Sequence, residues 1–171
     1  RQMFIHTWGS EKLEVIANLM ENLWTLFPSP LFVGSAKNRV KKIEDAILQM
    51  NMMTEDFIAL LPDFKKYNLN ILTDTHIESF TRKATQYIRH MTEKGMPLAK
   101  KRVFISKKDL DNPEKLDPNL ISFFDEARAI LSETASLLSQ LELTLNLRIN
   151  DDSSTGLEAE LLNQSSIIFT T

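Results

Sequence analysis

The stretch that divides this chain reads FIALLPDFKKYNLNIL and runs from Phe57 to Leu72. It lies between two long patterns of helical spacing and belongs to neither of them. Pro62 lacks an N–H and disfavours a helical conformation at the residue before it, so we expect the incoming helix to end at about Leu61. Thr75, with Glu78 three residues later, has the spacing of a capping box and predicts the start of the next helix.

The connection between these two helices is longer than a bundle turn usually needs. It mixes apolar residues with Lys65 and Lys66, and two interpretations stay open. Either it folds back onto the helices as part of the core, or it is held outward for a partner. In the second case the predicted partner-binding residues are Pro62, Asp63, Phe64, Lys65, Lys66, Tyr67, Asn68, Leu69 and Asn70.

Four segments place apolar residues at alternating steps of three and four, which indicates amphipathic helices. Proline, glycine or capping residues bound each segment. The predicted helices span about 11–27, 36–61, 75–94 and 118–148. Because the link 29–35 is short, we expect the second helix to run opposite to the first. The sequence therefore predicts an all-α fold, an antiparallel four-helix bundle with long helices.

The predicted bundle domain covers residues 1–150. After Asn150 the apolar spacing gives way to polar residues, so 151–171 are expected to form a polar linker and an apolar C-terminal tail. Within this part, Leu157, Leu161 and Leu162 fit a short frayed helix. The chain begins with Arg1 rather than Met, so we expect it to be a fragment.

Two basic segments are interpreted as solvated surface. One is the start of the second helix, with Lys37, Arg39, Lys41 and Lys42. The other is the stretch 100–108, for which a polyanion site is the alternative. Within that stretch, Val103–Ile105 fits either a short strand or a return to helix.

Composition excludes several classes of function. The chain has 171 residues, a net charge of -3 and no cysteine. The net charge gives no general reason to expect nucleic-acid binding, and the lack of cysteine removes disulfides and zinc–thiolate sites. No apolar run reaches the roughly 18 residues of a membrane span, so we expect no membrane partner.

Catalytic and metal-binding patterns are missing. His6, His76 and His90 lack the Glu-x-x-His spacing of a di-iron bundle, and His90 with Glu93 reverses that order and is interpreted as a surface pair. No phosphate-binding glycine loop or nucleophile motif is present. We therefore expect no enzyme activity, no metal and no cofactor.

The order of these features resembles the proteasome activator REG (11S regulator) family. Its first helix ends in an aromatic-Phe-Pro step, similar to Leu26-Phe27-Pro28, and its second ends in an apolar run before a proline, similar to 57–62. A capped third helix interrupted by a proline (here Pro97) and a long fourth helix follow in both. The resemblance covers about Glu11 to Arg148, although the loop after Pro62 is basic where the family's loop is acidic.

The resemblance implies a protein that makes or breaks no bond. Four-helix protomers would form a homo-oligomeric ring that docks on the core proteasome and opens its gate, in the cytoplasm or nucleus. The loop Pro62–Asn70 would take the role of the family's activation loop. If Thr171 is the natural C-terminus, the docking tail would comprise Ile167, Ile168, Phe169, Thr170 and Thr171.

Two alternatives stay open. One is a helical adaptor or scaffold subunit of a coiled-coil assembly, and the other is an enzyme or ligand-binding bundle. Self-association is expected from the long apolar seam of the fourth helix and from apolar positions predicted to be exposed, such as Trp24 and Phe32.

Overall fold

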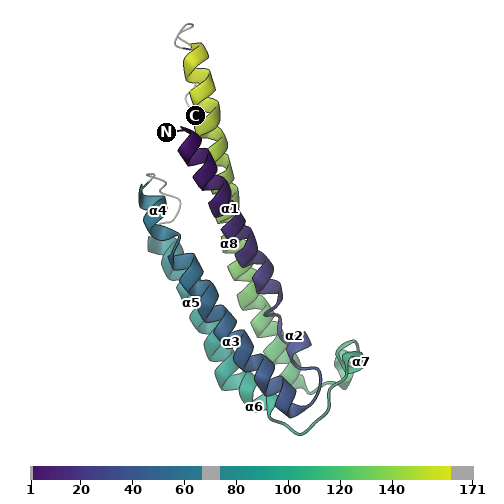
Figure 1. Ribbon diagram of the computed structural model, residues 1–171. Helices are drawn as coiled ribbons and strands as arrows, with labels where there is room; N and C mark the ends of the chain where they lie inside the picture. Colours follow the sequence, from purple (N-terminus) through teal and green to yellow (C-terminus); the bar gives the residue numbers. More distant parts are fainter. Residues whose placement is uncertain (1, 67–73, 163–171) are drawn as a thin grey trace.

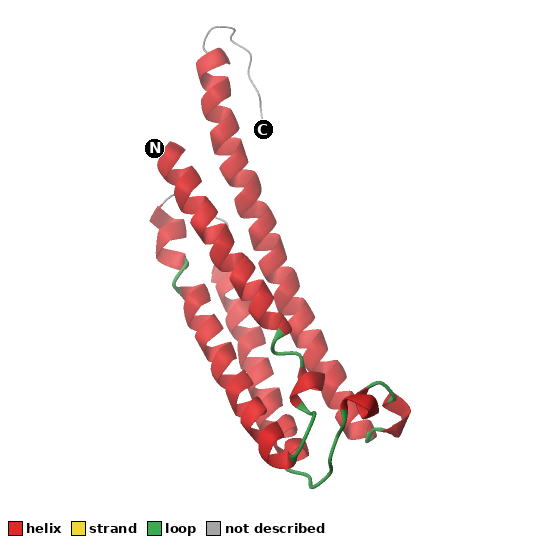
Figure 2. Cartoon of the chain, turned by 45° about the vertical axis from the view of Figure 1, so that its right-hand side comes forward, coloured by secondary structure: helices red, strands yellow, loops and turns green. Residues whose placement is uncertain are grey.

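The fold is all-α, as the sequence predicts. The computed structural model describes residues 2–66 and 74–162, and these are helical almost throughout (Figures 1 and 2). No strand occurs in this part of the chain. The one β-type pairing there is an isolated bridge between Gly34 and Ile105.

Long and short helical elements alternate along the described residues. The long helices are α1 (Gln2–Trp24), α3 (Ala36–Ile58), α5 (Asp74–His90) and α8 (Pro118–Leu162). The short ones are α2 (Pro28–Leu31), α4 (Leu61–Lys66), the π-helix η1 (Met91–Gly95), α6 (Met96–Ala99), α7 (Lys107–Leu110) and the 3-10 turn η2 (Pro113–Lys115).

Helix α8 is the element along which the others assemble. Helix α1 lies alongside it, α5 packs on it as well, and α3 packs mainly on α5 (Figure 1). At about 1.5 Å per residue, the 45 residues of α8 span about 68 Å. Such a helix offers a seam long enough to bury the apolar faces of both α1 and α5.

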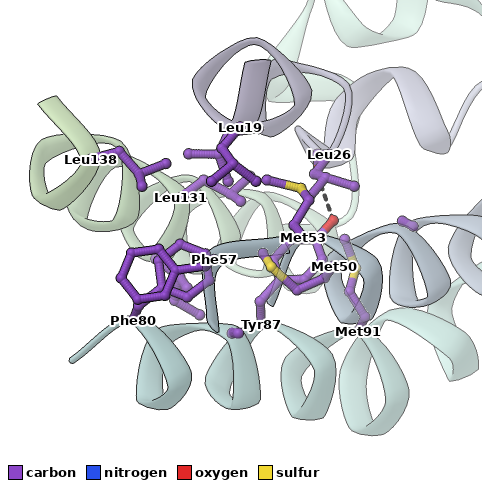
Figure 3. Close-up of a cluster of buried hydrophobic side chains, with 14 of the residues drawn as sticks. Leu19, Leu26, Met50, Met53, Phe57, Phe80, Tyr87, Met91, Leu131 and Leu138 are labelled. Atoms are coloured by element: carbon purple, nitrogen blue, oxygen red, sulfur yellow. Dashed lines mark hydrogen bonds between the residues drawn. The ribbon is translucent and has the colours of Figure 1, made fainter. Parts of the chain in front are cut away.

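The predicted apolar seams form the core. Ile43, Met50 and Phe57 of α3 are fully buried, and the whole predicted seam of α8 from Leu120 to Leu145 is buried too. The rings of Phe57 and Phe80 stack with their centroids 4.1 Å apart (Figure 3). Aromatic pairs of this kind add to the stabilisation that burial alone gives.

Several helix boundaries differ from the prediction. Helix α1 begins at Gln2 and ends at Trp24, and α3 ends at Ile58, three residues before the predicted end. Helix α8 continues to Leu162, through the polar residues that we expected to form a linker. Helical spacing of apolar residues marks only the part of a helix that is buried, so a helix that continues past its packing partners leaves no such signal.

Gly95 and Pro97 predict that the helix ends or kinks near these residues. The helical path does not end there, because it continues through the π-helix η1 into α6. A π-turn adds a residue to the turn, which lets a helix accommodate a proline that would otherwise clash with the carbonyl four residues earlier. Gly95 matters for packing here. A Cβ at this position would come within 2.9 Å of the Phe123 ring of α8.

Tyr87 ties α5 to the end of α1. Its buried hydroxyl donates a hydrogen bond of 2.6 Å to the Leu26 carbonyl oxygen, just beyond the last residue of α1 (Figure 3). Carbonyls at helix C-termini lack partners within the helix, so this bond satisfies a group that needs one. Burial also raises the pKa of the Tyr87 phenol, because the phenolate is poorly solvated there.

We predict that Tyr87→Phe lowers the free energy of unfolding by about 1–2 kcal/mol at neutral pH. Folding favours the protonated phenol, so this contribution is complete below the ordinary tyrosine pKa of about 10 and is lost as the pH rises above it. Urea unfolding at pH 8 and at pH 11 should therefore show a smaller alkaline loss of stability in Tyr87→Phe than in the parent protein. Equal losses in the two proteins would contradict this role.

Candidate functional site

Both ends of the helical assembly carry features that the sequence singled out. One end holds α4 and the segment expected to contact a partner. The other holds α6, α7 and the basic stretch 100–108 (Figure 1).

Helix α4 forms the first part of the connection that the sequence predicts after the second helix. Pro62 is its second residue, a position where the missing N–H costs no helical hydrogen bond, and its side chain is exposed. Phe64, by contrast, is buried, and its ring meets the Trp8 ring edge-on with centroids 5.2 Å apart. For Phe64 the structure thus agrees with the interpretation in which the connection folds back onto the helices.

The remaining predicted contact residues are only partly placed. Asp63, Lys65 and Lys66 are residues of helix α4. The residues that lie outside the described part of the chain are Tyr67, Asn68, Leu69 and Asn70 of the loop and Ile167, Ile168, Phe169, Thr170 and Thr171 of the tail.

We predict that Phe64→Ala lowers the free energy of unfolding by about 3 kcal/mol or more, the usual cost of removing a buried aromatic ring. Pro62→Ala is the matched control, because Pro62 is exposed two residues away, and we expect a change of about 0.5 kcal/mol or less. Chemical denaturation followed by circular dichroism measures both. A Phe64→Ala protein as stable as the control would show that this ring is not part of the core.

Arg39 is the main correction to the surface prediction. Its side chain is fully buried, whereas we expected the basic start of the second helix to be solvated. The reason is its register: Arg39 lies four residues before Ile43 and eleven before Met50, on the stripe of α3 that faces the core. The sequence prediction placed Val40 on that stripe, and Val40 is only half-buried.

The Arg39 guanidinium joins three separate segments. Its Nε donates to the Ala99 carbonyl oxygen at 3.2 Å, and its two terminal nitrogens donate to the carbonyl oxygens of Gly34 and Lys101. Burial lowers the pKa of the guanidinium, but arginine stays protonated in proteins. A permanent cation therefore satisfies carbonyls before α3, at the end of α6 and in the following loop.

The loop after α6 is fixed at a second point by Gly34. This glycine has φ +105°, a conformation that residues with a Cβ rarely adopt, and its N–H donates to the Ile105 carbonyl oxygen at 2.8 Å. Of the two predicted alternatives for Val103–Ile105, the helix is wrong, since the described residues there form only this isolated bridge.

His90 lies in a second polar cluster, between α5 and α8. It is buried rather than on the surface, its Nε2 lies 2.8 Å from the Phe123 carbonyl oxygen, and its ring stacks on the Phe123 ring. Its Nδ1 lies 3.3 Å from a carboxylate oxygen of Glu126, which Lys94 also contacts at 3.2 Å. The predicted partner Glu93 is thus replaced by Glu126, a residue of another helix that spacing along α5 does not reveal.

The His90 cluster links helix α5 to helix α8. Both ring nitrogens already face protein oxygens, so neither is directed at a substrate. In the described part of the chain, no group of three or more histidine or carboxylate side chains could hold a metal ion.

Of the two apolar residues expected to be exposed and to drive self-association, one is exposed and the other is buried. Trp24 is exposed, with 67% of its surface accessible, as predicted. Phe32 is fully buried and packs against Phe123 and Phe124 of α8, so that expectation is wrong. Other exposed large apolar residues on the long helices are Leu48, Met52, Ile58, Leu143 and Leu147.

Comparison with known proteins adds no relative. A scan against protein-family models, a search of curated proteins and a search of solved structures each found no match. Among the described helices, none is both long and apolar enough to cross a membrane.

Proposed function

We propose that this chain is a non-enzymatic, proteasome-activator-like protein. Its four long helices form an antiparallel bundle, copies of the bundle assemble into a ring, and the ring docks on the core proteasome and opens its gate. The proposal rests first on the sequence resemblance to the REG family and then on the geometry below.

The observation that carries the proposal is the common end of α4 and α8. Helix α4 ends at Lys66 and α8 ends at Leu162, and both lie toward the same end of the molecule, where α8 continues well beyond α4 (Figure 1). In the REG family the activation loop and the C-terminal tail act on the same face of the proteasome. The corresponding segments here begin at one end of the molecule, as that mechanism requires.

Exposed apolar side chains on the long helices support a ring of protomers. Leu48 and Met52 are exposed in the middle of α3, four residues apart, and Trp24 is exposed at the C-terminal end of α1. Leu48 and Met52 are neighbours on one face of α3, and adjacent exposed apolar side chains of this kind are typical of contacts with other chains. In a ring, neighbouring protomers would cover them side by side and leave the end with α4 free for docking.

The burial of Phe64 restricts which residues can act as the contact element. The Phe64 ring packs against Trp8 and is not free to contact a partner. The proposal therefore assigns gate opening to the exposed Pro62 and to Tyr67 and Asn68. Phe64 then has the separate task of anchoring α4 to α1.

The test measures hydrolysis of a fluorogenic peptide by purified core proteasome, together with sedimentation velocity of the chain. We expect a ring-sized oligomer and a stimulation of roughly fivefold or more, the lower end of usual allosteric couplings. The double variant Tyr67→Ala/Asn68→Ala should keep the oligomer and lose the stimulation. Lys37→Ala, an exposed change at the start of α3, is the control and should keep both.

A monomer at tens of micromolar, or an oligomer that leaves hydrolysis unchanged, would contradict the proposal. An assembly that forms only with a second, different chain would favour the helical adaptor instead.

A further inference from the structure

Two large apolar side chains are exposed at the end of the molecule opposite α4. Val103 has 59% and Phe104 72% of its surface accessible, the latter the highest value among the exposed large apolar residues of the described chain. Both lie in the loop between α6 and α7.

This exposure is built into the fold. On one side of the pair, the Lys101 carbonyl oxygen accepts a hydrogen bond from the buried Arg39. On the other side, the Ile105 carbonyl oxygen accepts one from the Gly34 N–H, and the Ile105 side chain is buried. Because the loop is fixed at both points, Val103 and Phe104 are held outward, and such preorganisation lowers the entropic cost of binding.

A cavity of about 290 Å³ lies beside the exposed pair. Leu98, Ile105, Leu116 and Leu120 supply apolar walls, and Val103 and Phe104 line it as well. Ligand pockets usually measure about 300–1,000 Å³, so this cavity suits a single anchoring side chain rather than a whole cofactor.

The surroundings of the cavity are positively charged. The stretch 100–108 carries no acidic residue, and its five cations are all exposed: Lys100, Lys101, Arg102, Lys107 and Lys108. Residues 100–117 contain six cations and four acids, a net charge of +2 in a chain whose net charge is -3.

The two acidic residues at the cavity are already engaged. The Asp109 carboxylate accepts a hydrogen bond of 2.8 Å from the Ser106 N–H, and the bonds to Ser106 lower its pKa. The Asp117 carboxylate accepts hydrogen bonds from the Asn119 N–H at 2.9 Å and from Lys101 Nζ at 3.2 Å. Both bonds lower the pKa of Asp117, and the bond from Asn119 has the larger effect. The other cations of the stretch are therefore left to act on a partner.

We propose that this cavity and its basic rim bind an acidic peptide segment of a partner protein. One large apolar side chain of the peptide enters the cavity beside Phe104, and acidic residues on either side of it lie against the cations of 100–108. A single exposed aromatic ring does not form the stacking platform that single-stranded nucleic acid uses, so the chemistry favours a peptide. The site is independent of the proposed action on the proteasome, since it lies at the other end of the molecule.

The experiment uses the full chain and three fluorescein-labelled peptides in an anisotropy titration. The first peptide has one phenylalanine between two pairs of glutamates, the second has alanine in place of phenylalanine, and the third has lysines in place of the glutamates. We expect the first to bind with a Kd below about 1 mM and the other two about tenfold or more weakly. Added salt should weaken binding of the first peptide, because it screens exposed charges.

Variants locate the site on the protein. Phe104→Ala and the pair Arg102→Glu/Lys107→Glu each change only exposed side chains, and each should weaken binding of the first peptide by about tenfold or more. The control pair Arg82→Glu/Arg89→Glu makes the same change of charge on exposed positions of α5 and should leave the Kd within about twofold. Circular dichroism verifies that all variants keep their helices.

Three outcomes would overturn the proposal. The first is equal binding of the three peptides, or no binding of any. The second is a control pair that weakens binding as much as the site variants do. The third is tighter binding to single-stranded RNA or to phosphatidylserine vesicles, lost in the same site variants, which would assign the patch to a polyanion or a membrane surface.

Discussion

The arrangement of this molecule depends on one buried cation, the guanidinium of Arg39. It donates to carbonyl oxygens of Gly34, Ala99 and Lys101, so one side chain joins the turn before α3 to the end of α6 and the loop beyond it. Charge-assisted hydrogen bonds are stronger than neutral ones, and three carbonyls around one guanidinium disperse its charge without a carboxylate. Removing the side chain would leave the buried Ala99 acceptor and the partly buried acceptors of Gly34 and Lys101 without this partner.

The same interaction explains why the helical path from α5 to α6 ends where it does. Ala99 is the last residue of α6, and the final carbonyls of a helix have no partner within the helix. A cation at this position also interacts favourably with the negative end of the helix dipole. With the end of α6 fixed to α3, the chain can leave the core and present residues 100–117 before α8 begins.

Much of the fold follows from apolar spacing in the sequence, because burial of one helical face sets a period that can be counted. The seam of α8 was predicted on this basis and is buried, whereas the predicted seam of α3 is buried at Ile43, Met50 and Phe57 and only partly buried at its other positions. The course of α8 beyond Asn150 was missed, because apolar spacing indicates where a helix is packed and gives no signal where it is not. The π-turn at 91–95 was missed as well, because a Gly and a nearby Pro normally indicate that a helix ends.

The candidate contact residues were harder to predict, for reasons that differ from one position to the next. Phe64 is buried because α4 turns it toward Trp8, which lies far away in sequence. Arg39 has the heptad spacing of a core residue, but its charge argued for solvent, and only the carbonyls of a distant loop reverse that argument. Phe104 was one aromatic among lysines, and its exposure results from contacts made by Arg39 and Gly34 on either side of it.

Hydrogen exchange of single amides tests the role of Arg39 most directly. The comparison is between the parent protein, Arg39→Met and the control Lys37→Met, an exposed change in the same turn of α3. The account predicts that Arg39→Met speeds exchange by about tenfold or more at Gly34, Lys100 and Lys101, with little change in the central parts of α1 and α8. The control should match the parent protein. Unchanged exchange at these three amides, or an equal acceleration throughout the chain, would contradict the view that Arg39 fixes this end of the molecule.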